Sequence, residues 1–393
     1  MSTPVTLAIV GAGGRGTSYA RYALQHPEQV RIVGVAEPRP FYREQLAREH
    51  HLPADCVFRS WEELAARPRF ADGVVIATLD DLHAAPAVAL AARGYHLLLE
   101  KPMAPTEADC ERIVRAVQQA GVLFAVCHVL RYTPYTRCLK QVVDSGAIGE
   151  VVSLQHLEPV GYWHQAHSYV RGKWAREADS TFMLMAKSCH DLDWMRYIVG
   201  RPCRRVASFG ALTHFRPENR PAGAADRCLD CAVEATCPYS ARRIYLDRLR
   251  AGETGWPVDV VTPQPTEASL IEALRTGPYG RCVYAGQTDV VDHQVVSMEF
   301  EGGRSGTFTM TGFTQGNHRI TRLFGTRGEA YCDGLHVRHF DFLTDRWIEH
   351  PLPAIDSSIQ AGHGGGDYYL MQAFVAALQS GDQRHILSGP AES

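Results

Sequence analysis

The chain has 393 residues, 45% of them hydrophobic, and a formal net charge of −3 at pH 7. This near-neutral charge leaves no electrostatic footprint for nucleic acid or an anionic membrane. No apolar run approaches the roughly 20 residues of a membrane span. The chain enters its first predicted strand without a charged and apolar leader, so we expect a soluble, cytoplasmic protein of two domains.

A glycine-rich motif follows the first predicted strand, Thr6–Val10, and precedes a predicted helix, Thr17–Gln25. The first glycine of G-x-G-x-x-G allows a tight turn, the second a close approach of pyrophosphate, and the third close packing of helix on strand. The start of the helix offers free N–H groups to phosphates. This context predicts a dinucleotide site. Its residues are Gly11, Gly13, Gly14, Arg15 and Gly16.

An acidic residue, Glu37, stands at the end of the second predicted strand, Val30–Ala36. A carboxylate at this distance from the glycines binds the ribose hydroxyls of an NAD-type cofactor and repels a 2′-phosphate. The pattern therefore favours NAD as cofactor. Arg39 lies two residues further on and leaves NADP open.

Strands and helices alternate through the first 127 residues, which is typical of a doubly wound parallel sheet of the Rossmann type. The further strands predicted there are Cys56–Phe58, Gly73–Ala77, Tyr95–Leu99 and Val122–Val126, and the further helices are Phe41–His50, His83–Arg93 and Thr106–Ala120. Thr106 is the predicted N-cap of the last helix.

Separate strands with alternating polarity begin at Val151, which predicts an α+β C-terminal domain with a large open, mostly antiparallel sheet. The predicted strands are Val151–Leu157, Arg205–Ala211, Val295–Phe300, Ser305–Thr311 and Gly328–Asp333. We expect a cofactor domain over residues 1–128 and a substrate and oligomerisation domain over 129–393. The second domain contains a cysteine-bearing insertion at about 214–285.

The tripeptide Glu100-Lys101-Pro102 directly follows the predicted strand Tyr95–Leu99. Ligands of doubly wound sheets bind at the carboxyl ends of the strands, so Lys101 is predicted to face the cofactor crevice. A lysine there can act as acid or base, or can polarise a substrate hydroxyl.

Together, the glycine motif, Glu37, Ala77-Thr78 and Glu100-Lys101-Pro102 resemble the Gfo/Idh/MocA family of NAD(P)-dependent oxidoreductases. The resemblance covers nearly the whole chain. It implies a Rossmann domain, a second domain on a large open sheet, and substrates that are sugars, cyclitols or their derivatives. It also implies that Thr78, His83 and Glu100 line the cofactor site and that Lys101 is the catalytic lysine.

A second family-like motif is the stretch Lys187-Ser188-Cys189-His190-Asp191. By resemblance, His190 is the active-site histidine, and a histidine can accept a hydroxyl proton near neutral pH. Many members carry an aspartate four residues earlier, where this chain has Ala186. The pattern resembles a subgroup in which Lys187 occupies the site beside His190, and Asp191 is a further candidate contact.

Three other segments are candidates for substrate binding, because aromatic faces stack on sugar rings while arginine and histidine donate to hydroxyls. The candidates are His128 and Arg131 at the domain junction, Tyr162, His164, His167, Arg171 and Trp174 in a predicted loop, and His363 and Asp367 in the glycine-rich run before the last predicted helix. Asp367 is also the predicted N-cap of that helix, Tyr368–Gln379.

Clustered cysteines mark the insertion. The spacing is C-x2-C-x5-C with a distant fourth cysteine, and the residues are Cys228, Cys231, Cys237 and Cys282. Four thiolates can close a tetrahedral site, which predicts structural zinc. An iron–sulfur cluster uses the same ligands, and unligated cysteines are the third alternative.

The leading functional hypothesis is an NAD-dependent dehydrogenase that acts on a hydroxyl of a sugar or sugar-like compound. The alternatives are a redox-neutral NAD-dependent glycosidase and a non-catalytic sugar-sensing regulator. By analogy with the family we expect a homodimer or homotetramer.

Overall fold

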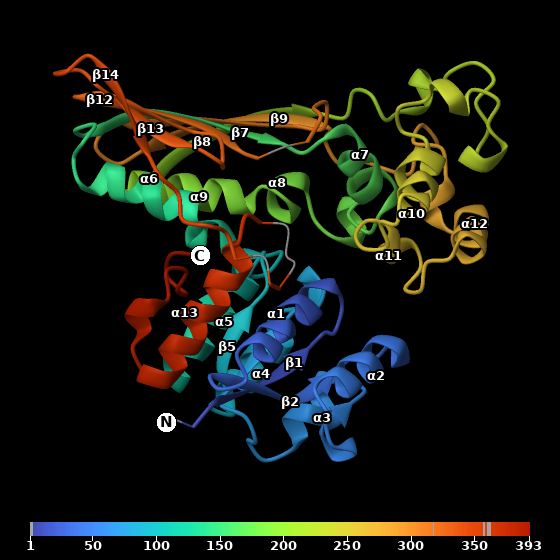
Figure 1. The fold of residues 1–393 in the computed structure, drawn as a ribbon, viewed down its shortest axis with the longest axis horizontal. Helices are drawn as coiled ribbons and strands as arrows, with labels where there is room; N and C mark the ends of the chain where they lie inside the picture. The colour runs from blue at the N-terminus through green and yellow to red at the C-terminus, as the bar shows by residue number, and fades with distance from the viewer. Residues whose placement is uncertain (1–2, 317, 357, 360–362) are drawn as a thin grey trace. The chain divides into compact units, whose positions relative to one another are not determined.

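The computed structural model describes residues 3–316, 318–356, 358–359 and 363–393 (Figure 1). The chain forms two compact units. The first unit contains residues 1–150, 189–200 and 325–393, and the second contains residues 151–188 and 201–324. Both units are therefore assembled from separated stretches of sequence.

The first unit contains a six-stranded parallel sheet in the order β3-β2-β1-β4-β5-β6. This is the Rossmann order. Successive strands are added on one side of β1 as far as β3 and then on its other side from β4 onward, and ligands of such sheets bind in the crevice at this switch point. The predicted doubly wound sheet is confirmed. Its strands are β1 Val5–Val10, β2 Val30–Ala36, β3 Val57–Phe58, β4 Gly73–Ile76, β5 His96–Leu99 and β6 Phe124–Val126.

Four of the helices beside this sheet begin and end within a few residues of the predicted bounds, whereas the short helix α3 was not predicted. Thr106 caps α5 by accepting a hydrogen bond from the Asp109 backbone N–H at 3.2 Å, and Gly121 ends it in the left-handed region at φ 64°. The helices are α1 Gly14–Gln25, α2 Pro40–Glu49, α3 Trp61–Ala66, α4 Ala84–Ala92 and α5 Glu107–Ala120.

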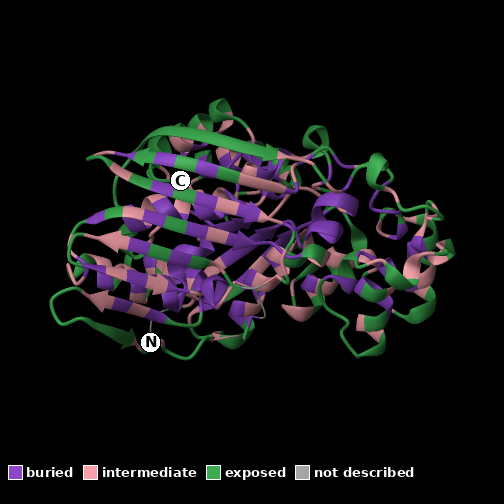
Figure 2. Cartoon of the chain, turned by 90° about the horizontal axis from the view of Figure 1, so that it is seen from above, coloured by how far each residue is buried: buried purple, intermediate pink, exposed green. Residues whose placement is uncertain are grey.

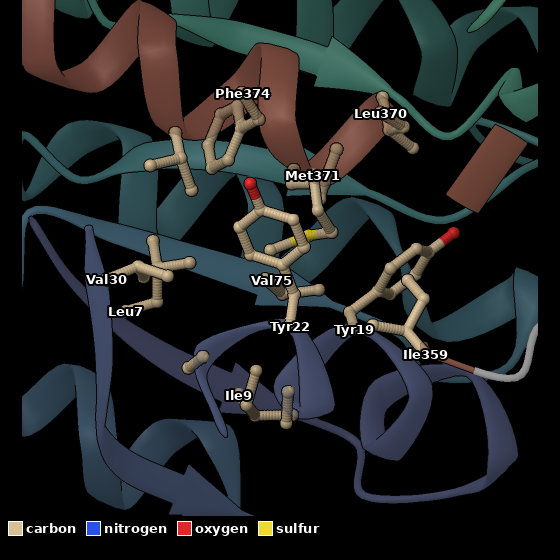
Figure 3. Close-up of a cluster of buried hydrophobic side chains, with 14 of the residues drawn as sticks. Leu7, Ile9, Tyr19, Tyr22, Val30, Val75, Ile359, Leu370, Met371 and Phe374 are labelled. Carbon is tan, nitrogen blue, oxygen red and sulfur yellow. The ribbon is translucent and has the colours of Figure 1, made fainter. Parts of the chain in front are cut away.

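The C-terminal helix α13, Gly366–Ser380, completes one face of this core (Figure 3). Its Met371 and Phe374 pack in the same cluster as Leu7 of β1 and Tyr22 of α1, all nearly or fully buried. Each such side chain contributes about 1.5–3 kcal/mol relative to an exposed one. The C-terminal helix is therefore part of the core beside the six-stranded parallel sheet.

Further elements of the first unit are α6 Pro134–Asp144, α9 Cys189–Val199, β12 Gly328–Cys332, β13 Val337–Asp341 and β14 Arg346–His350. The predicted N-cap of α13 is wrong, because Gly365, in the left-handed region at φ 81°, occupies that position. Asp367 lies inside the first turn, where its carboxylate binds Arg15 and His363 instead of the helix backbone.

The eight-stranded sheet has the order β14-β13-β12-β11-β7-β10-β9-β8. β10 pairs with β7 in parallel, whereas β8–β9, β9–β10, β12–β13 and β13–β14 are antiparallel, so the predicted mostly antiparallel sheet is confirmed. Buried and exposed residues alternate along strands such as β9 and β10 (Figure 2). The remaining bounds are β7 Val151–Pro159, β8 Cys203–Ala211, β9 His293–Phe300, β10 Arg304–Thr311 and β11 Ile320–Gly325.

The insertion between β8 and β9 consists of short helices around an apolar core of its own. Phe215, Tyr245, Leu270 and Leu274 are fully buried there. Its α-helices are α10 Arg248–Arg250, α11 Val258–Val261 and α12 Glu267–Thr276. The second unit also contains the short helices α7 Tyr162–His164 and α8 Met183–Ala186. Across the described ranges, no helix combines the length and apolar character needed to cross a membrane.

Candidate active site

The turn between β1 and α1 requires two of the predicted glycines. Gly11 has φ +92°, and a Cβ there would lie 2.6 Å from the carbonyl oxygen of Ala77. A Cβ on Gly16 would lie 1.9 Å from the carbonyl oxygen of Gly11. Both contacts are too short for any side chain, so these glycines hold the helix against the strand.

The other two glycines leave the helix N-terminus accessible. A Cβ on Gly14 would meet nothing within 4 Å, and one on Gly13 would meet only the Arg39 guanidinium, at 3.3 Å. The backbone at Gly14 is therefore free of side-chain cover, and at Gly13 only the end of the flexible Arg39 side chain comes close. Such an arrangement fits the pyrophosphate of a dinucleotide.

Glu37 lies at the end of β2 with an almost completely buried carboxylate. It accepts hydrogen bonds from the Ala12 backbone N–H at 2.9 Å and from Arg39 Nε at 2.7 Å. Although burial raises the pKa of Glu37, the hydrogen bonds from Arg39 and Ala12 lower it below its ordinary value. The group is thus an ionised carboxylate fixed next to the glycine turn.

His83 joins the loops that follow β4 and β5. It is fully buried, and its Nδ1 lies 2.8 Å from the carbonyl oxygen of Pro102. Its Nε2 lies 3.4 Å from the carbonyl oxygen of Thr78, whose hydroxyl donates to Leu82. These contacts fix both loops at the carboxyl ends of adjacent parallel strands.

Glu100 anchors the loop that carries Lys101. Its Oε1 accepts from Arg15 Nε at 2.6 Å and from the Tyr19 hydroxyl at 2.8 Å, and its Oε2 accepts from the Lys101 backbone N–H at 2.8 Å. Burial raises the pKa of Glu100, but the charges of Arg15 and Lys101 bring it below its usual value. An ionised carboxylate therefore holds the lysine loop to the first turn of α1.

Lys101 is also electrostatically coupled to Cys189 and His128. Burial raises the pKa of the Cys189 thiol to about 12, and the positive charge of Lys101 opposes that rise. Burial lowers the pKa of His128, and the charge of Lys101 adds to the effect. The lysine predicted from the sequence thus shares a site with residues of α9 and of the segment after β6.

Three histidines from distant parts of the chain form a row in the first unit. The ring centroids of His128 and His190 are 6.2 Å apart, and those of His190 and His363 are 5.6 Å apart. His128 and His190 are almost fully buried. The structure therefore brings together three of the candidates that the sequence could only place separately.

Asp367 ends this row. Its carboxylate lies 2.9 Å from His363 Nδ1 and forms an ion pair with Arg15. Although burial raises the pKa of Asp367, the charges of Arg15 and His363 hold it well below its usual range. Arg15, a candidate cofactor contact, links this carboxylate to Glu100.

Arg131 and Asp191 are also buried in the first unit. The Arg131 guanidinium pairs with Asp193 of α9, with Nε 2.8 Å from the carboxylate, and donates to the Leu387 carbonyl. Asp193 also lies 3.7 Å from His128 Nδ1. The same aspartate thus contacts both candidates from the segment after β6.

In the second unit, Lys187 forms an ion pair with Glu158 of β7, with its Nζ 3.0 Å from Oε1. The Arg319 guanidinium lies 2.9 Å from the other oxygen of the same buried carboxylate. Glu158 was not among the predicted site residues, although its position directly after the predicted strand Val151–Leu157 was a usable signal.

The segment predicted as an aromatic loop is helical, because α7 continues into a π-helix over Gln165–Arg171. His164 packs against Trp256 of the insertion at 4.9 Å between ring centroids, and Tyr162 packs against Tyr239 at 6.3 Å. Trp174 lies under the Lys173 ammonium at 4.3 Å. Trp256 is an aromatic contact that was not predicted from the sequence.

Family models match both parts of the chain. The model described as an oxidoreductase family with an NAD-binding Rossmann fold matches residues 5–128, and its companion C-terminal α/β domain matches residues 140–389. The chain belongs to the Gfo/Idh/MocA family. It is accordingly an oxidoreductase-family protein with an NAD-binding domain.

Relatives of this Gfo/Idh/MocA protein include an oxidoreductase named YteT from Bacillus subtilis (strain 168), 26% identical over 81% of this chain and 75% of that protein. A 2,7-anhydro-N-acetylneuraminate hydratase from Escherichia coli (strain K12) is 26% identical over 54% of this chain and 55% of its own. A scyllo-inositol 2-dehydrogenase (NAD⁺) from Bacillus subtilis (strain 168) is 22% identical over 78% and 94%.

Among solved structures, levoglucosan dehydrogenase in complex with NADH and levoglucosan has a TM-score of 0.67 at 19% identity, over 99% of this chain and 93% of that chain. An oxidoreductase from Agrobacterium radiobacter with NAD⁺, L-tartaric acid and magnesium has a TM-score of 0.69 at 15% identity, over 99% and 92%. At these identities the likeness shows the fold of the Gfo/Idh/MocA protein.

Two candidate substrate residues, both on the π-helix, are buried against the insertion of this Gfo/Idh/MocA protein. His167 Nδ1 is 2.8 Å from the Tyr245 hydroxyl, and its ring stacks on Tyr279 at 5.0 Å. Arg171 Nε donates to the Arg281 carbonyl at 2.7 Å and its Nη2 to the Tyr239 carbonyl at 2.9 Å. These hydrogen bonds join both side chains to the insertion.

Acid is expected to destabilise the insertion through His167. Burial, reinforced by the charges of Arg171 and Arg248, lowers the pKa of His167 to about 3. The unfolded chain takes up a proton near pH 6.5, so stability falls as the pH drops from about 6.5 to 3. Between pH 7 and pH 5 this amounts to about 2 kcal/mol at 1.4 kcal/mol per pH unit. Chemical denaturation at pH 7 and at pH 5, followed by the fluorescence of the aromatic residues in the insertion, measures this loss of unfolding free energy.

The variant His167→Gln keeps a hydrogen-bonding group for Tyr245 without a titrating ring. Between pH 7 and pH 5, the unfolding free energy of this variant should fall by about 2 kcal/mol less than that of the unmodified protein. An equal pH dependence in both proteins would show that other groups are responsible.

The predicted zinc site is not supported by the structure. Within the described ranges, no three ligating side chains gather closely enough to hold a metal ion. The four cysteines instead line one cavity of about 100 Å³, together with Arg171. The Arg171 guanidinium lies in the same wall, with Nη2 3.3 Å from Cys228 Sγ.

Proposed function

We propose that the protein is an NAD-dependent dehydrogenase that oxidises a hydroxyl-bearing carbon of a sugar, cyclitol or related compound. The observation that carries this proposal is the anchoring of Lys101 by Glu100 and Arg15 beside the open glycine turn. A lysine held next to a dinucleotide site is suited to manage the substrate proton. The names of the inositol and levoglucosan dehydrogenases among the relatives support this substrate class.

The bound cofactor would supply the hydride acceptor. Lys101 would take the hydroxyl proton, directly or through His190. Because burial lowers the pKa of His128, that ring stays neutral at physiological pH and can accept or donate a hydrogen bond to a substrate hydroxyl. Asp367 would fix the tautomer and orientation of His363 through its contact with Nδ1.

In the second unit, a separate set of residues is proposed to contact a sugar-like ligand. Lys187, ion-paired with Glu158, would donate to hydroxyls, and the aromatic rings of Tyr162, His164 and Trp174 would stack on a sugar ring. His167 and Arg171 would support this segment from the insertion side.

A redox-neutral reaction is the second candidate, and the hydratase relatives favour it. In such a reaction the substrate is oxidised transiently, a group is eliminated or added, and the carbon is reduced again, so that no reduced cofactor accumulates. The same lysine and histidines would move the protons. A sugar-sensing regulator without turnover is the third candidate.

A substrate screen separates these functions. Sugars, cyclitols, anhydrosugars and aryl glycosides are each incubated with the protein and NAD or NADP, and both reduced cofactor and released aglycone or rearranged sugar are measured. Net NADH identifies the dehydrogenase, and product without net NADH identifies the redox-neutral enzyme. A protein that binds neither nucleotide contradicts both.

Glu37 is expected to set the preference for NAD. The variant Glu37→Gln removes the charge that pairs with Arg39 and that would meet the ribose of NAD. Loss of one charged hydrogen bond, about 1.5–3 kcal/mol, should weaken NADH binding about tenfold or more, while NADPH binding improves. Fluorescence titration with both nucleotides measures the two affinities.

The exposed Glu28, just before β2, provides the matched control, because Glu28→Gln should leave both affinities unchanged. If Glu37→Gln weakened NADH and NADPH equally, the carboxylate would contribute to the fold of the site instead of cofactor choice.

We also propose a homodimer or homotetramer in the cytoplasm. The edge strand β8 exposes Val206 at 63% and Phe209 at 80% of their surface, and burial of such side chains by another copy is favourable. Light scattering on the purified protein tests the assembly, and a single-chain mass would contradict it. Cell fractionation tests the location.

A further inference from the structure

The histidine row of the first unit consists of His128, His190 and His363, and its three rings differ in their access to water. His128 and His190 are almost fully buried, whereas 27% of the His363 side chain is exposed. Oxidation of a hydroxyl group releases one proton in each turnover, and a proton taken up by a buried ring needs a path to solvent. Within this row, the path to solvent leads through His363.

The glycines at positions 364–366 allow His363 to join the row. The first two have φ +58° and +81°, a backbone conformation that other residues rarely adopt, and a Cβ on the third would lie 2.3 Å from the Val129 carbonyl oxygen. The chain therefore turns tightly after His363, and the start of α13 packs against the segment after β6. The His363 ring centroid lies 5.6 Å from that of His190, within reach of proton transfer directly or through one water molecule.

The opposite end of the row is a poor place for a proton. Burial lowers the pKa of His128, although the nearby carboxylate of Asp193 opposes this effect. Asp193 lies 3.7 Å from His128 Nδ1 and is already paired with the Arg131 guanidinium, whose Nε is 2.8 Å from the carboxylate. A proton on His190 is therefore not drawn toward His128.

The carboxylate of Asp367 prepares His363 to accept a proton. Although burial raises the pKa of Asp367, the charges of Arg15 and His363 bring it well below its usual range. An ionised carboxylate only accepts hydrogen bonds, so His363 Nδ1, 2.9 Å away, carries a proton and Nε2 is left as the acceptor. When Nε2 takes up a second proton, the negative charge of Asp367 stabilises the resulting imidazolium.

We propose that His363 is the proton exit of the candidate active site and that Asp367 is its positioning residue. The substrate hydroxyl proton reaches His190, directly or from Lys101, and passes from the His190 imidazolium to His363 Nε2. His363 then releases it to water or to a buffer base. Each transfer breaks one bond to hydrogen and forms another, no electrons move along the row, and both rings end each turnover neutral. The inference rests on the proposed dehydrogenase, which releases one proton per turnover.

The variant His363→Gln tests the exit by kinetics. Glutamine can still donate to Asp367 but cannot carry a proton. In dilute buffer, with the substrate found in the screen, kcat should fall about tenfold or more while NADH affinity is unchanged. Added imidazole is a mobile proton carrier and should restore kcat in proportion to its concentration. No loss of kcat, or a loss that imidazole does not restore, overturns the proposal.

The matched control is His336→Gln in the same unit. His336 also contacts a carboxylate through Nδ1, at 3.1 Å from Asp333, but its side chain is 68% exposed and belongs to a surface turn. Its kcat should equal that of the unmodified protein with and without imidazole. The same loss and rescue in this variant would overturn the assignment of the exit to His363.

A second measurement does not depend on turnover. In NMR spectra of the full chain labelled with ¹⁵N-histidine, and assigned by comparison with His363→Gln, neutral His363 should carry its proton on Nδ1. A proton on Nε2 overturns the proton exit and leaves the dehydrogenase proposal intact. A protein with the expected tautomer that turns over no compound in the screen overturns the dehydrogenase, and the exit with it.

Discussion

Replacement of Lys101 by methionine should lower kcat/KM about 10²- to 10⁴-fold while leaving NADH affinity nearly unchanged, because the group that moves the substrate proton is removed and the glycine turn is not. Methionine is unbranched like lysine and only one atom shorter, so it keeps most of the side chain without the charge. The backbone N–H that binds Glu100 also remains, so the loop stays anchored. Steady-state kinetics on the substrate found in the screen, with calorimetric titration of NADH, measures both quantities.

The matched control for this variant is Lys140→Met. Lys140 lies on α6, where its ammonium pairs with the exposed Asp144 four residues on. Such a surface pair contributes less than about 1 kcal/mol, so activity and nucleotide affinity should both be unchanged. If Lys101→Met retained full activity, proton transfer would have to be assigned to the histidine row instead.

Replacement by alanine should have very different effects on stability at Gly16 and at Gly14. Gly16→Ala places a Cβ 1.9 Å from the Gly11 carbonyl oxygen, which forces α1 away from β1. We expect a loss of about 3 kcal/mol in unfolding free energy and loss of NADH binding. Gly14→Ala meets nothing within 4 Å, so its effect on stability should stay below about 1 kcal/mol and can be favourable, since alanine is the better helix former.

Thermal unfolding of both variants, followed by circular dichroism with and without NADH, measures this contrast. Unfolding temperatures lowered equally in both would show that the tight packing at Gly16 does not determine the stability of the turn. A stable Gly14→Ala protein with weakened NADH binding would support the approach of the pyrophosphate to this backbone.

Much of the nucleotide-binding half was predictable because its signals are local. The glycine motif, Glu37 and Lys101 are each adjacent to a strand with a continuous apolar run, and in a parallel sheet the ends of such strands meet at one edge. The family resemblance then implied which of these residues contact the cofactor and which is the catalytic lysine. The structure places these residues on the loops that the sequence indicated.

Partnerships over long sequence distances could not be predicted in the same way. Nothing in the local pattern around Arg15 shows that its guanidinium binds Asp367, 352 residues away. For the same reason Asp367 was predicted as a helix cap, which is its commonest role at such a position. The strands β11, β13 and β14 were missed because five or six residues with mixed polarity carry little periodic signal.

The cysteine pattern shows what the spacing of residues in a sequence cannot predict. C-x2-C-x5-C with a distant cysteine specifies that thiols can meet, but not how far apart they stand. Nor does it indicate that Arg171, more than fifty residues before the first of them in the chain, lines the same space.

The position of α13 has a consequence for protein engineering. The Tyr368 hydroxyl lies 3.0 Å from His26 Nε2, and the Tyr368 ring packs against Tyr22. The C-terminal helix and the second half of α1 therefore form one packed layer. A recombinant hybrid that takes its nucleotide-binding half from this protein and everything after residue 150 from a homologue would replace one side of that layer with foreign residues. Crossover points for gene shuffling should therefore be chosen in pairs, near residues 150 and 325, so that both terminal segments come from the same parent.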